Sequence, residues 1–256
     1  MKNIVGFIIA LKGHQTDVAT INTYLPNVKV FDAIDTRDKD LQRLPVHPGA
    51  LAGIKKTYFS DSFQVPSKGA IGCALSHYAV WERCLALRAP IVVFEEDVVF
   101  DRDTASSILN GLETLPPDTM YASLMGIPSS VWHVASPDRA LENSPYEGWY
   151  KAGLGMLGTQ CYYIAPAGAR ILLQHAYPVC YQVDIYIASV AYTNPSFKAY
   201  RTKRNPYSVA KCLADFGAST IGYGKTSVKL FLPESNWVYA LVLLFLVIYV
   251  AKKIVA

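Results

Sequence analysis

Residues 69–100 read GAIGCALSHYAVWERCLALRAPIVVFEEDVVF, and this stretch decides the fold. Apolar side chains recur at steps of three and four residues from Ala70 to Leu87, which predicts an amphipathic helix that ends before Pro90. The apolar run Ile91 to Phe94 then predicts a short strand buried on both faces. A helix followed by a buried strand is typical of an α/β protein whose helices cover a sheet.

The rest of the chain repeats this alternation. Apolar runs predict strands at residues 4–11, 28–33, 121–126 and 158–164, and residues 167–175 predict a helix. The first two strands and the polar segment between them form a β-α-β unit, while prolines and glycines indicate a long loop around residues 45–66. Because no internal repeat divides the chain, we predict one open α/β domain over residues 1–210.

The C-terminal part has a different composition. The 256 residues are 52% hydrophobic and 17% charged, which excludes a disordered chain. Trp237 to Ala251 is an uncharged apolar run followed by two lysines. We expect residues 237–256 to form a C-terminal hydrophobic helix that anchors the protein in the membrane by a single pass. A helix of this run spans only about 22 Å, so a buried C-terminal helix is the alternative.

Basic residues gather before that run, and residues 211–236 are expected to form a basic linker. The expected partner of these charges is an anionic lipid or a diphosphate, and a solvated basic face is the alternative. No nucleic acid is expected as a partner, because no recognised nucleic-acid module accompanies the charges.

Five cysteines are spread along the sequence, an odd number without a CxxC pair or another zinc-ligand spacing. We therefore expect reduced thiols. Without a recognisable signal peptide, we also expect the catalytic domain to be cytoplasmic. The five residues are Cys73, Cys84, Cys161, Cys180 and Cys212.

Three acidic residues, Glu95, Glu96 and Asp97, directly follow the buried strand of the opening stretch. Like charges repel there, and a bound Mn2+ or Mg2+ would relieve the repulsion. Open α/β sheets bind ligands beyond the carboxyl ends of their strands, where this triplet should lie. If the segment is extended, Glu95 and Asp97 point to one side and Glu96 to the other. A solvated loop is the alternative, and phosphotransferases and nucleases also use such a triplet.

Four motifs occur in the order found in glycosyltransferase family 25, the group of lipopolysaccharide and collagen galactosyltransferases. Residues 69–100 resemble the family's G-cALSH-W-lEDD stretch. The segments IIALK with FDAIDTRD, GTQCYYIAPAGARILL, and QVDIYI around Asp184 resemble its other elements. The resemblance covers roughly residues 4–210.

The resemblance implies a GT-A-like, Rossmann-related open mixed sheet flanked by helices. It also implies inverting transfer of galactose or a similar hexose from a nucleotide-diphosphate donor, with a UDP-sugar favoured, to an acceptor hydroxyl. The acceptor is a glycan, a lipid-linked glycan or a protein. Glu95, Glu96 and Asp97 match the family's metal motif. Glu95 is also expected to contact the donor. Glu96 stands where the family has Asp. Divalent metal neutralises the charge that develops on a departing diphosphate.

Further residues are expected at this site. Asp184 is the candidate base that takes the acceptor proton, with a helix cap or metal neighbour as the alternative. Lys12, where the family has an arginine-rich turn, is the candidate diphosphate contact unless it is simply solvated. Thr159 and Gln160 are expected to contact donor or acceptor hydroxyls, with ordinary strand pairing as the alternative. His77 is predicted to be a hydrogen-bonded packing residue rather than a ligand.

Two other functions stay open, the first because of the departures at Glu96 and Lys12. One is a non-catalytic, membrane-bound relative that keeps the fold. The other is a metal-dependent phosphotransferase that uses the same acidic triplet.

Overall fold

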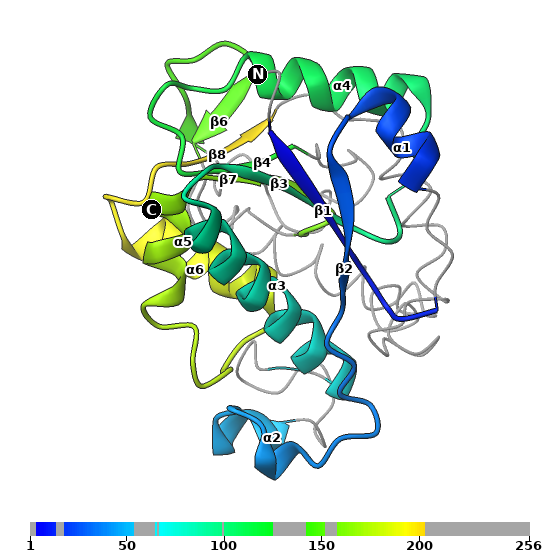
Figure 1. The fold of residues 1–256 in the computed structure, drawn as a ribbon. Helices are drawn as coiled ribbons and strands as arrows, with labels where there is room; N and C mark the ends of the chain where they lie inside the picture. The colour runs from blue at the N-terminus through cyan, green and yellow to red at the C-terminus, as the bar shows by residue number, and fades with distance from the viewer. Residues whose placement is uncertain are drawn as a thin grey trace, which may run out of the picture.

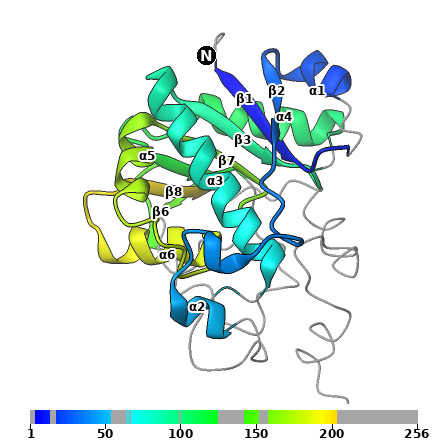
Figure 2. The ribbon, with the colours of Figure 1, turned by 60° about the horizontal axis from the view of Figure 1, so that its bottom comes forward.

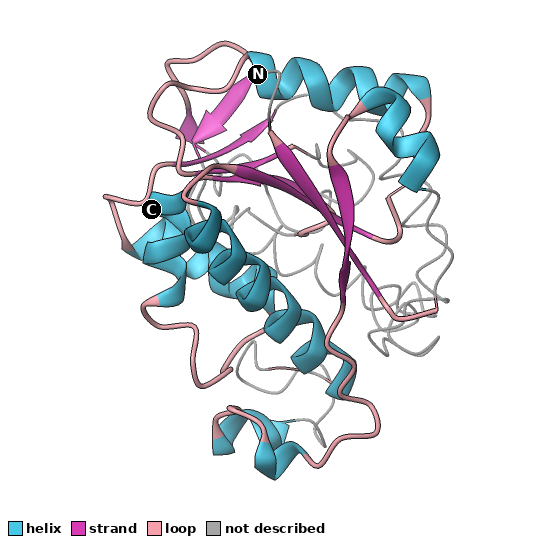
Figure 3. Cartoon of the chain, viewed as in Figure 1, coloured by secondary structure: helices cyan, strands magenta, loops and turns pink. Residues whose placement is uncertain are grey.

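The computed structural model describes residues 4–13, 18–53, 65, 67–98, 100–124, 142–151 and 158–202. Within these residues, eight strands form one mixed sheet in the order β2-β1-β3-β7-β4-β8-β6-β5, with helices on its faces (Figure 1, Figure 3). The strands are β1 (Val5–Ala10), β2 (Val28–Asp32), β3 (Ile91–Glu95), β4 (Tyr121–Ser123), β5 (Glu142–Asn143), β6 (Trp149–Lys151), β7 (Cys161–Ile164) and β8 (Ala199–Thr202). The α/β class and the mixed sheet predicted from the sequence are confirmed.

Helices cover both faces of the sheet. The helices are α1 (Val18–Tyr24), α2 (Pro48–Gly53), α3 (Lys68–Leu87), α4 (Arg102–Glu113), α5 (Pro166–Leu173) and α6 (Val183–Thr193), with a 3-10 turn η1 (Leu41–Arg43). Helices α3, α5 and α6 pack on one face, and α1 and α4 pack on the other (Figure 1, Figure 2). The sheet is therefore the middle layer of three.

Strand β3 shows how the alternation of side chains divides the core. Ile91 and Val93 belong to the core under α3, whereas Val92 and Phe94 belong to the core under α4. By the same alternation the next residue, Glu95, points to the side of α3. This two-residue period decides which helix the first acidic side chain meets.

The carboxyl ends of several strands meet at one edge of the sheet. Strand β1 pairs in parallel with both β2 and β3, so the segments that follow these three strands leave the sheet together. Strand β7 runs antiparallel to β3 and begins at this edge, where the Glu95 N–H donates to the Gln160 carbonyl at 2.9 Å. The edge therefore gathers the residues after β3 and the residues before β7.

Helix α3 matches the amphipathic helix expected between Ala70 and Leu87. The Ser67 hydroxyl caps its first turn by accepting the Ala70 N–H at 3.1 Å, and Arg88 ends it in the left-handed conformation with a φ of 52°. A left-handed residue after the last turn is a common way to end a helix. Tyr78 and Trp81 lie on its buried face.

The single-pass membrane anchor expected at residues 237–256 is not supported. Across the described part of the chain, no helix combines the length and the apolar character needed to cross a bilayer. Helix α3 has enough residues, but Lys68, Glu82 and Arg83 interrupt its apolar surface. Residues 237–256 and the expected basic linker at 211–236 lie outside the described residues. We therefore withdraw the membrane localisation.

Candidate active site

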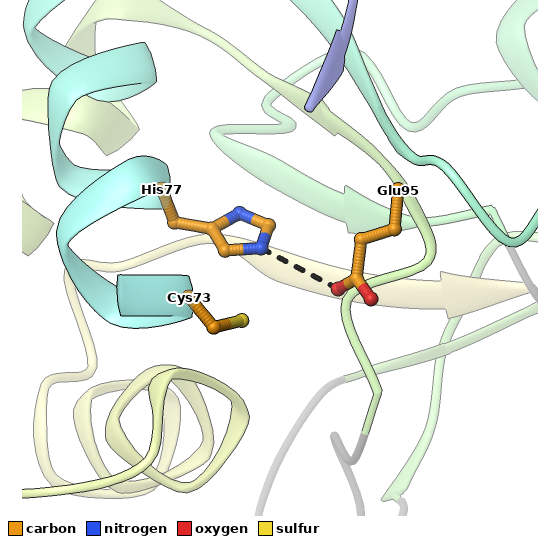
Figure 4. Close-up of side chains that lie close together, drawn as sticks. All are labelled: Cys73, His77 and Glu95. Atoms are coloured by element: carbon orange, nitrogen blue, oxygen red, sulfur yellow. Dashed lines mark ion pairs between the residues drawn. The ribbon is translucent and has the colours of Figure 1, made fainter. Parts of the chain in front are cut away.

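Glu95 lies at the end of β3 and faces the buried side of α3 (Figure 4). Its Oε1 accepts a hydrogen bond from the Thr159 hydroxyl and lies 3.4 Å from Nε2 of His77. Burial raises the pKa of Glu95, but the neighbouring His77 ring and the Thr159 hydroxyl lower it, and the net pKa lies below its ordinary value. The carboxylate form of Glu95 is thus favoured at this position.

Glu96 and Asp97 do not continue the strand. The Val98 N–H donates to the Glu95 carbonyl at 3.2 Å, so both residues lie in a turn and strand alternation does not apply to them. The Glu96 Oε2 accepts the Leu11 N–H at 2.9 Å, which ties the turn to the end of β1. Asp97 is exposed. The three neighbouring carboxylates therefore have three different environments.

Asp184 lies in the first turn of α6 and comes close to Glu95 in space. Its Oδ2 accepts the Gly158 N–H at 3.1 Å, and its Oδ1 accepts the Ile185 N–H at 2.8 Å. Burial raises the pKa of Asp184, the two backbone N–H groups lower it, and the charge of Glu95 raises it, with a net increase. The structure thus brings together the two acidic residues that the motifs had placed far apart in sequence.

Gly158, Thr159 and Gln160 shape the edge of the site before β7. Gly158 has a φ of 87°, and a Cβ on it would lie 2.5 Å from Oε1 of Gln160. Thr159 contacts Glu95 through its side chain, whereas the Gln160 carbonyl pairs with the backbone of Glu95. Strand pairing therefore accounts for the Gln160 backbone, and the position of Thr159 fits a role beside Glu95.

Lys12 lies in the exposed turn that follows β1. Its neighbour Leu11 is the residue whose N–H binds Glu96, so Lys12 stands at the same edge of the sheet as the acidic turn. Gly13, which follows it, has a φ of 91°. The turn therefore presents a cation near the acidic residues without fixing it on one of them.

Sequence reasoning did not assign Arg201 to the site. Arg201 lies on β8, is 4% exposed and faces the α3 side of the sheet with Ala199. Burial lowers its pKa to about 10, while Tyr121 and Asp184 act in the opposite direction. In the sequence, Arg201 could have been noticed as a charged residue within the short strand AYRT. A charge buried in a strand needs a partner and therefore indicates a nearby acidic group. Among the described residues, Asp184 supplies a negative charge that favours the charged form of Arg201.

Several carboxylates act on Cys73 of α3. Burial raises the pKa of the Cys73 thiol, and the charges of Glu95, Asp184 and Asp97 raise it further. These carboxylates offer the oxygen ligands that Mn2+ and Mg2+ prefer. The acidic triplet, however, does not converge on one point. Among the described residues, the ligand atoms that come within 4.8 Å of one another belong to Cys73, His77 and Glu95.

The chain is similar to known glycosyltransferases. The sequence profile of glycosyltransferase family 25 (LPS biosynthesis protein) matches residues 4–187. The rat protein named probable inactive glycosyltransferase 25 family member 3 is 31% identical over 157 residues, covering 57% of this chain and 25% of the relative. The human inactive glycosyltransferase 25 family member 3 is 30% identical over 149 residues, covering 57% and 24%.

A relative whose name states an activity also matches. Human procollagen galactosyltransferase 2 is 25% identical over 118 residues, covering 45% of this chain and 18% of the relative. The chain spans about a quarter of the length of the curated relatives that it matches first. Because the family profile matches residues 4–187, which is most of the sequence, the chain belongs to glycosyltransferase family 25.

Proposed function

We propose that this chain is a glycosyltransferase with a GT-A-like donor site, which transfers galactose or a similar hexose from a nucleotide diphosphate to an acceptor hydroxyl with inversion. The observation that carries the proposal is the position of the acidic residues at the carboxyl edge of the sheet. Glu95 ends β3 and accepts the Thr159 hydroxyl, and Asp184 accepts the N–H of Gly158, the residue before Thr159. Open α/β sheets bind ligands at such an edge. Family membership supports the same reaction class.

The proposed cofactor is Mn2+ or Mg2+, held by Glu95 and Asp97 with water and donor phosphate filling the other positions. Once bound, the ion would supply positive charge for the departing diphosphate. The support in this chain is that the charge of Glu95 raises the pKa of Asp184, a repulsion that a cation would relieve. Glu96, although it matches the metal motif, uses its carboxylate to hold the Leu11 N–H.

Asp184 is the proposed general base. Its two carboxylate oxygens are oriented by the N–H groups of Gly158 and Ile185, and burial raises its pKa toward the range where a carboxylate accepts protons well. In this role it takes the proton of the acceptor hydroxyl as that oxygen attacks the sugar. The buried Arg201 would supply positive charge near the carboxylate, because the charge of Asp184 favours the charged form of Arg201.

The proposed donor is a UDP-sugar, and the proposed acceptor is a glycan, a lipid-linked glycan or a protein. In this proposal Lys12, in the turn after β1, contacts the diphosphate, and Thr159 and Gln160, which precede β7, contact sugar hydroxyls. The name of human procollagen galactosyltransferase 2 supports galactose as the sugar and a protein as one acceptor class.

The test compares two neighbouring carboxylates by conversion to amides. Glu95→Gln should lower turnover of UDP-galactose with Mn2+ by roughly 100-fold or more, as for loss of a group that stabilises developing charge. Glu96→Gln keeps an oxygen that accepts the Leu11 N–H and should stay within a few-fold of the wild type. UDP release is measured with and without acceptor. Full activity of Glu95→Gln would refute the assignment.

A non-catalytic relative is the second candidate, because several relatives of this chain are named inactive. A UDP-sugar that binds without turnover should raise the melting temperature with Mn2+ while no UDP is released, since a ligand stabilises the state it binds. Release of UDP that depends on Glu95 would exclude this candidate.

A further inference from the structure

A second set of chemically reactive side chains lies beside Glu95, under α3 (Figure 4). Cys73, His77 and Glu95 each offer one ligand atom, and these atoms all lie within 4.8 Å of one another. Cys73 and His77 are four residues apart on α3 and therefore share one face of the helix. The alternation along β3 turns Glu95 toward that face, so two elements build the cluster together.

Of the two ring nitrogens of His77, one has a hydrogen-bond partner and the other has none. Nδ1 lies 2.8 Å from the hydroxyl of Tyr162, which also accepts the indole N–H of Trp81 at 2.9 Å. Nε2 is buried and has no hydrogen-bond partner, because its 3.4 Å contact with Glu95 is an electrostatic pair rather than a well-formed hydrogen bond. A buried polar atom without a partner is costly and points to a missing ligand.

The arrangement is not that of a Cys-His-Glu nucleophile. In such a triad the histidine uses one nitrogen for the nucleophile and the other for the carboxylate. Here the thiol and the carboxylate both lie on the side of the ring that carries Nε2, and Tyr162 occupies the other nitrogen (Figure 4). Convergence on one point is instead what a metal ion requires.

We propose that Cys73, His77 through Nε2, and Glu95 bind Zn2+, with water in the fourth position. Sulfur, imidazole nitrogen and carboxylate oxygen are the ligands of zinc, whereas Mn2+ and Mg2+ take oxygen ligands. Atoms that bind tetrahedral zinc at about 2.0–2.3 Å stand roughly 3–4 Å apart, so Nε2 and Oε1 at 3.4 Å already have that separation. The side chain of Glu95 is 25% exposed, which leaves a side open to water.

The charge of the ligands and the residues that orient His77 also fit a zinc site. Binding releases the thiol proton of Cys73 to solvent, and the thiolate and the Glu95 carboxylate together balance the two positive charges of the ion. Tyr162 and Trp81 fix the plane of the His77 ring, which is how outer partners support metal-binding histidines. Zinc binding does not require transferase activity. The two proposals share Glu95: its Oε1, beside His77, would bind zinc, and its Oε2 would be the oxygen for the donor-site metal.

The first experiment titrates the full, metal-free chain with Zn2+ against a chromophoric zinc indicator, without nucleotide sugar. The wild type should bind one Zn2+ tightly, and Cys73→Ser should weaken binding by more than about 100-fold, beyond the effect expected for an outer partner. Tyr162→Phe should weaken binding by about 10- to 100-fold. Cys180→Ser is the matched control, because its thiol contacts the Pro178 carbonyl at 3.2 Å, outside the cluster.

The second experiment replaces zinc with Co2+, whose bond to a thiolate gives a charge-transfer band in the near ultraviolet. The band should appear in the wild type and in Cys180→Ser and be absent from Cys73→Ser. If Cys73→Ser does not fold, protection of wild-type Cys73 from alkylation by added Zn2+, mapped by mass spectrometry, decides the matter. A missing cobalt-thiolate band, an unchanged affinity in Cys73→Ser, or alkylation unaffected by Zn2+ would overturn the proposal.

Discussion

Adjacent acidic residues in this protein have different environments because a strand ends between them. Glu95 still follows the alternation of β3 and meets His77 and Thr159, whereas Glu96 lies in the turn and holds the Leu11 N–H. Asp184, from a distant helix, adds a third carboxylate whose pKa is raised above its ordinary value of 3.8. At the scale of the residue, chemistry depends on which neighbour each carboxylate meets.

The raised pKa of Asp184 predicts a specific dependence of stability on pH. Because the folded protein holds this proton more tightly than the unfolded chain does, the stabilisation is complete below the unfolded pKa near 3.8 and is lost as the pH rises through the folded pKa. Asp184→Asn cannot ionise, and its one amide oxygen can replace only one of the two carboxylate acceptors, so it loses a constant amount of stability at every pH. On top of that constant loss, its stability relative to the wild type should rise as the pH increases above about 3.8. The pH-dependent part of the difference should amount to about 1.4 kcal/mol for each unit by which the pKa is raised.

Urea unfolding at a series of pH values measures this difference. The exposed Asp38, changed to Asn, controls for the loss of one negative charge and should not reproduce the trend. A difference between Asp184→Asn and the wild type that stays constant across the pH range would contradict the prediction.

Among the elements, α3 carries Cys73 and His77, and the loop after β2 is hydrogen-bonded to this helix. The Ser76 hydroxyl accepts the Ile34 N–H at 2.8 Å and donates to the Gly72 carbonyl at 2.6 Å. The Thr36 hydroxyl donates to the Lys68 carbonyl at the start of the same helix. These contacts join two of the family motifs, and they require the loop backbone to approach the helix closely at Gly72.

Gly72→Ala should destabilise the protein even though alanine favours helices. A Cβ at this position would lie 2.4 Å from the Ile34 carbonyl oxygen, so the loop must move away from α3. We expect a loss of about 1–3 kcal/mol in the free energy of unfolding, typical of overpacking, which exceeds the roughly 1 kcal/mol that alanine gains over glycine in a helix.

Gly111→Ala in α4 is the matched control. Its Cβ would lie 3.2 Å from Cδ2 of Leu124, the end of a flexible side chain that can shift. This variant should be as stable as the wild type or up to about 1 kcal/mol more stable. Equal unfolding midpoints in urea for both variants would contradict the role assigned to Gly72.

The whole molecule depends on a strand that lies beyond the family match. Strand β8 stands between β4 and β6, pairing in parallel with the first and antiparallel with the second. It also carries Arg201 to the site. The family profile ends at residue 187, whereas β8 spans Ala199–Thr202. The sheet is therefore complete only when the chain extends past the matched region.

A chain that ends after Ile187 should lose cooperative unfolding. Without β8, the backbone groups of β4 and β6 that face it lack partners, and the sheet is divided. A chain that ends after residue 210, the predicted boundary of the domain, should keep a single cooperative transition. Near-ultraviolet circular dichroism and urea unfolding distinguish the two chains. Native-like cooperativity in the shorter chain would show that β8 is dispensable.

Local patterns in the sequence were sufficient for several elements. The helical period between Ala70 and Leu87 predicted α3, and the run Ile91 to Phe94 predicted β3. They also placed the acidic residues at a strand end. The same patterns did not predict β5, β6 or β8. These strands have only two to four residues, and their extended conformation depends on pairing with neighbouring strands. The membrane anchor inferred from residues 237–256 was not supported.

What the sequence determined by itself is the alternation of helices and strands and the position of the acidic triplet, because hydrophobic periodicity acts over a few neighbouring residues. Only the tertiary structure decided that Glu96 binds the N–H of Leu11, 85 residues away. It also brought Asp184 and Arg201 near Glu95, and it turned Cys73 and His77 toward Glu95. These contacts depend on strand order and on the face that each side chain occupies, and both are set when distant segments pack together.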